Sequence, residues 1–273
     1  MKKILKSKII VASLLFVLLH MIGGLLIMAP LLVFLRIHFE HTGSALKLWP
    51  VISPEVLSDM LVNDSQALVM FFIAAAVIYI AYFPLKVFIT AGIYNIIIFK
   101  KESGEAIDSA RTFLTRSAGI WIGFVKADIF GILIYIVALF LGVVFGGFLG
   151  RLGPYWRPTV ILLLLLLGST YIQILKIAVV DNEDTSLRSV IRFTRGRIGG
   201  SFLRLVLGNV AVALVGFLIV LGLWSLLLWT RSYNWNVVTA SLSVILQQGM
   251  IFFICLAQVL RINFNYSVIK KGE

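Results

Sequence analysis

Six long apolar stretches, separated by shorter polar segments, run along the chain. They lie at about residues 9–34, 67–92, 127–149, 159–180, 205–229 and 238–260. A hydrocarbon core about 30 Å thick needs roughly 20 apolar residues per helix, so each stretch is long enough to cross a bilayer. The pattern therefore predicts an all-α fold: a polytopic helical bundle with six transmembrane helices, forming a single transmembrane domain over residues 1–273.

The basic residues between these stretches fall mainly on one side of the predicted membrane. Both termini and the connections 93–126 and 181–204, with the adjoining span ends, hold 18 of the 24 lysines and arginines. The opposite side holds 5, and Lys86 lies inside the second stretch. Because cytoplasmic segments carry the excess of Lys and Arg, we expect both termini in the cytoplasm.

Composition agrees with a membrane protein. The chain is 60% hydrophobic and 13% charged, with a mean hydropathy of +1.04. Its net charge of +12 would suit nucleic acid, but the basic residues flank the spans, so membrane topology explains them and we expect no nucleic acid partner. The one cysteine, Cys255, lies in an apolar stretch and supports neither a disulfide framework nor a metal site.

The connections on the basic side show an internal similarity at a shift of 80 residues. Ser109–Phe113 then falls on Ser189–Phe193, and Gly119 falls on Gly199. The segments 67–149 and 159–229 are therefore two possible copies of one unit, made of a helix, an elbow and a helix. The alternative is that both elbows obey the same interfacial physics without a common origin.

Each elbow has the pattern of an amphipathic helix, near residues 104–122 and 185–200. A helix with one apolar and one basic face is expected to lie in the headgroup plane of an anionic leaflet. Gly199 and Gly200 offer a place to turn from that plane into the bilayer, and Gly119 offers the same in the first copy. The side chains expected to face lipid headgroups are Arg111, Arg116, Arg188, Arg192 and Arg195.

The elbows carry a resemblance to a known group of proteins. A Ser-x-x-Arg-Phe pattern with basic residues and glycines, followed by a long apolar span, resembles poorly characterised prokaryotic six-helix membrane proteins. These include the membrane domain of some glycerophosphodiester phosphodiesterases. The resemblance covers about residues 99–149 and 180–229. It implies that the protein lies in the inner membrane of a prokaryotic cell. We see no attached phosphodiesterase domain in the chain, so the resemblance implies no catalytic residue.

Asp128 is the carboxylate that lies inside a predicted span, and it defines a candidate polar cluster. Intramembrane charges are rare and usually paired, which makes them candidate functional groups. Cations at a similar predicted depth could pair with Asp128, and an amide lies at the matching level of the second copy: Lys86, Lys176, Arg261 and Asn209. The alternative is that the long cationic side chains simply reach the interface.

Three other polar residues lie near the middle of spans: His20, Gln247 and Gln248. Such groups usually face other helices and hydrogen-bond there, so a structural role is favoured over proton transfer. A loop metal site from His38, His41 and Glu40 would need further ligands, and a solvated loop is the preferred interpretation. We predict no cofactor and no resident metal.

These observations favour a non-enzymatic integral membrane component, a permease-like or scaffold subunit. Its expected partners are the anionic cytoplasmic leaflet and either partner membrane proteins or further copies of itself. The alternative is a self-contained transporter of a small or amphipathic solute, for which repeated units and polar groups inside spans are suitable. An intramembrane enzyme acting on lipid ranks last, since only His20 and Asp128 offer acid–base groups.

Overall fold

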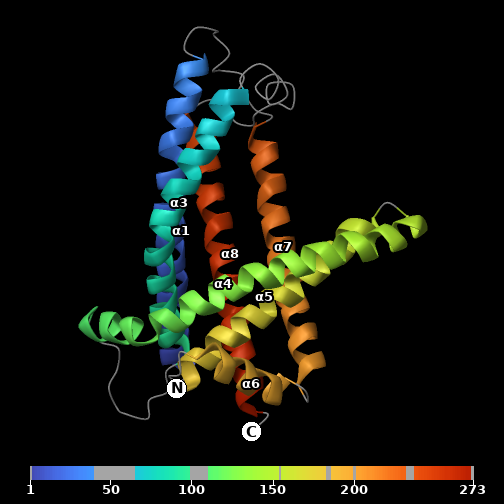
Figure 1. Cartoon of the computed structure of the whole chain (residues 1–273). Coiled ribbons are helices and arrows are strands. Elements are labelled where there is room, and N and C mark those ends of the chain that lie inside the picture. The colour runs from blue at the N-terminus through green and yellow to red at the C-terminus, as the bar shows by residue number, and fades with distance from the viewer. Residues whose placement is uncertain are drawn as a thin grey trace. The chain divides into compact units, whose positions relative to one another are not determined.

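The computed structural model describes residues 2–39, 65–98, 110–153, 155–182, 186–198, 201–231 and 237–271. These residues form seven α-helices and one short 3₁₀ helix, η2, with no strand among them. The α-helices (Figure 1) are α1 (Lys2–Phe39), α3 (Ser65–Ile98), α4 (Ala110–Leu149), α5 (Trp156–Asn182), α6 (Leu187–Ile198), α7 (Phe202–Arg231) and α8 (Val237–Lys271). Six of them, all but α6, are long and apolar enough to cross a membrane, which confirms the predicted all-α class and the number of candidate spans.

The helices extend well beyond the apolar stretches. Apolar surroundings require each backbone N–H and C=O to be paired within the chain, so a long apolar run forms a helix. The backbone bonding continues past the stretches: α3 runs through the mostly apolar residues 93–98 to Ile98, and α8 runs through several polar residues to Lys271. Apolarity thus marks the central part of each helix and not its ends.

A tight connection joins α4 to α5. It is made by η2 (Gly150–Leu152) and by Gly153, whose φ of 151° favours glycine. A Cβ on Gly142 would lie 3.0 Å from Ile161 Cγ1, and one on Gly146 would lie 3.2 Å from Arg157 Cα. Gly142 and Gly146 of α4 therefore let the α5 backbone approach closely. They serve a helix contact inside this chain.

The two predicted elbows differ. α6 is a separate helix that ends at Ile198, and α7 begins at Phe202 with the Ser201 carbonyl accepting a hydrogen bond from the Leu205 N–H. By contrast, α4 runs as one helix from Ala110 to Leu149 and includes Gly119, so the first elbow is not a break between two separate helices. A single glycine costs a helix only about 1 kcal/mol relative to alanine, less than breaking its backbone bonds in apolar surroundings would cost. Residues 104–109 of the first elbow lie outside the described residues.

The chain divides into two compact units, each described by itself. The second unit, Leu18–Lys86, holds the later part of α1 and the earlier part of α3. There the Tyr82 hydroxyl donates a hydrogen bond to the Leu19 carbonyl at 2.5 Å. Gly23 leaves room for the same ring, since a Cβ at this position would lie 3.0 Å from Tyr82 Cε1.

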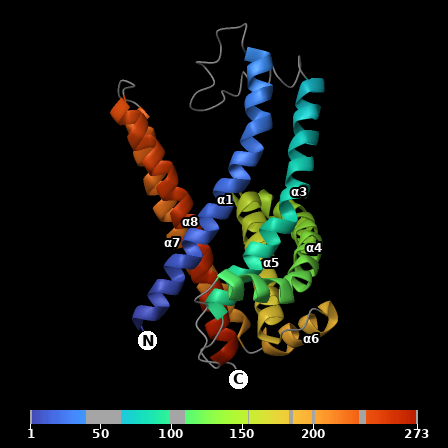
Figure 2. The ribbon, with the colours of Figure 1, turned by 90° about the vertical axis from the view of Figure 1, so that its left-hand side faces the viewer.

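The first unit contains the remaining helical segments, Met1–Val17 and Val87–Glu273. Two hairpins dominate it: α4 lies beside α5, and α7 lies beside α8 (Figures 1 and 2). Its buried side chains come from several of these helices, for example Tyr94, Phe124, Leu175, Leu205 and Ile262. In both views the first turns of α1 and the last turns of α8 lie at the same end of this unit.

Candidate functional site

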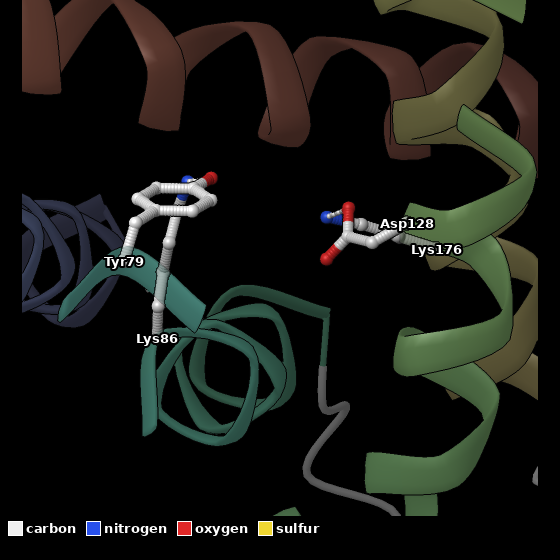
Figure 3. Close-up of polar contacts among 4 residues, drawn as sticks. All are labelled: Tyr79, Lys86, Asp128 and Lys176. Atoms are coloured by element: carbon white, nitrogen blue, oxygen red, sulfur yellow. Dashed lines mark hydrogen bonds and ion pairs between the residues drawn. The ribbon is translucent and has the colours of Figure 1, made fainter. Parts of the chain in front are cut away.

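An ion pair joins α4 to α5 inside the first unit. Lys176 Nζ lies 2.5 Å from Asp128 Oδ1, and the two side chains are 11% and 24% exposed. Figure 3 shows the two side chains directed toward one another. Of the cations predicted as partners of Asp128, the structure thus brings Lys176 to it.

Aromatic rings complete the surroundings of this pair. Lys176 Nζ lies 5.7 Å from the centroid of the Phe124 ring, and Phe124 precedes Asp128 by one helical turn. The Tyr94 ring meets Phe124 edge to face, with centroids 5.2 Å apart. A carboxylate and a ring face both stabilise the ammonium group, so the two charges offset each other locally and hold the hairpin together.

Arg261 and Asn209 form the centre of a second polar group, here called the amide network. Arg261 Nε donates to Asn209 Oδ1 at 2.9 Å. Its Nη2 donates to Ser169 Oγ at 3.2 Å and to Thr170 Oγ1 at 3.3 Å. The guanidinium of α8 is thereby fixed against side chains of α5 and α7.

Asn265 extends the amide network one turn further along α8. Its Nδ2 donates to Gln173 Oε1 at 3.0 Å, and Asn209 Nδ2 donates to Asn265 Oδ1 at 2.6 Å. Asn209 and Asn265 are fully buried, and Gln173 is 7% exposed. Buried amides are costly unless they pair, so these bonds specify how α5, α7 and α8 fit together.

The sequence interpretation missed Ser169, Thr170, Gln173 and Asn265. A signal was present: Ser169 and Gln173, like Arg261 and Asn265, are four residues apart and therefore share a helix face. The last predicted span ended at residue 260, which removed Asn265 from consideration. The network is thus formed by polar residues that recur at helical spacing within or just beyond the apolar stretches.

A cavity of about 500 Å³ adjoins the amide network between α5, α7 and α8. One part of its wall is polar, with Ser169, Gln173, Gln258 and Arg261. The rest of the wall is apolar: Ala213, Gly216, Phe217, Val220, Ile254 and Ala257. Such a division suits a ligand that has one polar and one apolar part.

A smaller cavity of about 340 Å³ lies between α5, α6 and α7. Its wall is mostly apolar, with residues such as Tyr171, Ile174 and Ile191, and Arg195 of α6 contributes a charge. Among the described residues, no group of three or more His, Cys, Asp or Glu could hold a metal ion.

Lys86, in the second unit, donates to the Tyr79 hydroxyl at 3.3 Å (Figure 3). His20 and Gln248 are exposed, and Gln247 is half-buried. Of the arginines expected to face lipid headgroups, Arg116 is half-buried, and the other four are exposed: Arg111, Arg188, Arg192 and Arg195. Glu40 and His41 lie outside the described residues.

The chain was compared with protein-family models, with curated proteins and with solved structures, and none of the three comparisons finds a match.

Proposed function

We propose that the chain is a non-enzymatic, multi-pass component of a prokaryotic inner membrane, a permease-like or scaffold subunit. Its basic helix α6 contacts the anionic lipids of the cytoplasmic leaflet, and its spans contact partner membrane proteins or further copies of the chain. The six long apolar helices support membrane insertion. The first turns of α1 and the last turns of α8 lie at one end of the first unit, which supports the same side of the membrane for both termini.

The observation that carries this proposal is the two-sided character of α6. Arg188, Arg192 and Arg195 are exposed, and their spacing of four and three residues places them on one helix face. Val190 and Thr194 are buried on another face, four residues apart. A helix packed by one face and basic on the other presents its charges to an anionic surface, where each is worth about 1 kcal/mol.

The test replaces Arg188, Arg192 and Arg195 with glutamine in the full chain. The melting temperature is then measured in nanodiscs of zwitterionic lipid and in nanodiscs that contain anionic lipid. We expect anionic lipid to raise the melting temperature of the parent and not that of the glutamine variant. The matched control replaces the same three residues with lysine, which keeps the charge and should keep the response. An equal response in the glutamine and lysine variants would contradict the proposed role of α6.

The partner role has its own test. The protein is purified in mild detergent from cells that express it at native level, and the subunits that co-purify are quantified. Stoichiometric partner subunits or a defined oligomer support a subunit role. A monomer that co-purifies with nothing contradicts that role and favours the second candidate function.

The second candidate is a self-contained transporter of a small or amphipathic solute. The cavity beside the amide network favours it, because a polar end and an apolar wall inside a helical bundle suit an amphipathic solute. Counterflow of labelled solutes into proteoliposomes tests this function. For a transporter, we expect uptake into proteoliposomes to exceed uptake into protein-free liposomes. Equal uptake into the two kinds of liposome, for every solute of a broad panel, would contradict a transport function.

A further inference from the structure

Arg261 carries a positive charge that no carboxylate offsets within the described part of the chain. Its hydrogen-bond acceptors are neutral oxygens: Asn209 Oδ1, Ser169 Oγ and Thr170 Oγ1. Asp128, by contrast, is already paired with Lys176. A charge removed from water is costly without a counter-ion, so the surroundings of Arg261 favour the entry of an anion.

The donors that remain around Arg261 face the cavity. The bonds of Arg261 use Nε and Nη2, and its Nη1 has no hydrogen-bond partner among the described residues. Gln173 accepts a bond through Oε1, which leaves its Nε2 as a donor. Both residues line the cavity, as does Gln258. Several N–H donors around one fixed guanidinium match the oxygens of a carboxylate or a phosphate group.

The rest of the cavity wall is apolar and suits a hydrocarbon group. Ala213, Gly216 and Val220 line it from α7, and Ala257 lines it from α8. These side chains offer no hydrogen bond, and the small residues let the two helices approach closely, since a Cβ on Gly216 would lie 3.3 Å from Ala257 Cβ. Phe217 and Ile254 also line it and are 61% and 51% exposed, so the cavity opens at the surface of the hairpin. A hydrocarbon chain satisfies this wall, and the opening gives it a route in from lipid.

We propose that this cavity binds an amphiphile with an anionic oxygen headgroup, whose acid group pairs with Arg261 and whose hydrocarbon chain lies along the apolar wall formed by α7 and α8. The shared chemistry is that of a fatty acid or a phosphate-headed lipid. A volume of about 500 Å³ is within the range of about 300–1,000 Å³ that is usual for small-molecule sites. The site does not depend on the contact of α6 with a lipid surface, so either can fail alone.

Native mass spectrometry of the detergent-solubilised full chain tests the site. The probes are palmitate, lysophosphatidate, lysophosphatidylcholine, a hexadecanoate methyl ester and inorganic phosphate. We expect one saturable adduct with palmitate or lysophosphatidate. We expect no comparable adduct with the methyl ester, the zwitterionic lipid or phosphate alone. Palmitate and lysophosphatidate together distinguish a carboxylate-selective site from a phosphate-selective one.

Two variants assign the adduct to the cavity. Arg261→Gln removes the charge and should weaken binding at least tenfold, since a hydrogen bond to a charged group is stronger than one between neutral groups. Ala213→Leu fills the apolar part, leaves Arg261 in place and should also weaken binding. The matched controls are Arg204→Gln and Ala211→Leu, both at exposed positions of α7, and both should bind as the parent does.

Three outcomes would overturn the proposal. The first is equal binding of the acid and its methyl ester, which would remove the role of the charge. The second is binding of phosphate alone as tightly as lysophosphatidate, which would remove the role of the chain. The third is unchanged binding in Ala213→Leu, whose polar residues stay intact and which therefore tests the cavity even where Arg261→Gln does not fold.

Discussion

Lys176 of α5 lies 2.5 Å from Asp128 of α4, and each offsets the charge of the other at the interface of one hairpin. Lys176 is the more buried of the two, with 11% exposure against 24% for Asp128. The ring of Phe124 lies 5.7 Å from the same ammonium group. Removal of Asp128 would therefore leave a buried cation with only an aromatic face to stabilise it.

We expect Asp128→Ala to destabilise the protein by about 3 kcal/mol, the lower end of the cost of breaking a buried ion pair, because Asp128 is partly exposed. Lys176→Met in the same chain should restore part of this loss, since the uncompensated cation is removed. Unfolding in mixed dodecyl sulfate micelles, arranged as a double-mutant cycle, measures the coupling energy. Strictly additive losses would show that the two charges do not stabilise each other.

The amide network makes a second prediction. Asn265→Leu should lower the free energy of unfolding by about 1–2 kcal/mol, because Gln173 Oε1 and Asn209 lose a buried partner. The matched control is Ser267→Ala on the same helix, where an exposed hydroxyl bonds only the Phe264 carbonyl; its loss should be within about 0.5 kcal/mol. Equal effects of the two substitutions in the same unfolding assay would contradict a stabilising network.

Two glycines of α7 provide a matched test of helix packing. A Cβ on Gly208 would lie 2.0 Å from Phe264 Cζ, whereas no described atom lies within 4 Å of one on Gly222. Gly208→Ala should therefore cost about 1–3 kcal/mol by overpacking. Gly222→Ala should be neutral or stabilising by up to about 1 kcal/mol.

The same unfolding assay measures both variants. Phe264→Leu added to Gly208→Ala should recover part of the loss, because the shorter side chain withdraws from the new methyl group. If Gly208→Ala were as stable as Gly222→Ala, α7 and α8 would not approach each other closely at Gly208.

The number of long helices was predictable from the sequence because the length of an apolar run is a local property. The helix ends were not, because bonding continues through polar flanks to residues such as Lys271. The ends of the elbow helices were also hard to predict from the sequence. A lone Gly119 leaves α4 intact, whereas Gly199 and Gly200, next to Ser201, fall where α6 gives way to α7.

The sequence predicted less well which side chains bind to one another. Depth along a span left three cations as partners for Asp128, and only the packing of α4 on α5 selects Lys176. Arg261 and Asn209 were expected at a similar level, but their bond depends on how α7 meets α8. Gln173 completes the network from α5, and nothing local to its own stretch marks it as a partner of Asn265.

We propose that the protein crosses the membrane six times and has both termini in the cytoplasm. Cysteine labelling determines the side of the membrane on which each connection lies. In a background of Cys255→Ser, single cysteines replace Ala45 and Ser103, in two connections outside the described residues. Intact cells are then treated with a membrane-impermeant maleimide. We expect Ala45→Cys to react in intact cells and Ser103→Cys to react only after the cells are lysed. Labelling of Ser103→Cys in intact cells with no labelling of Ala45→Cys would show that both termini lie outside the cytoplasm.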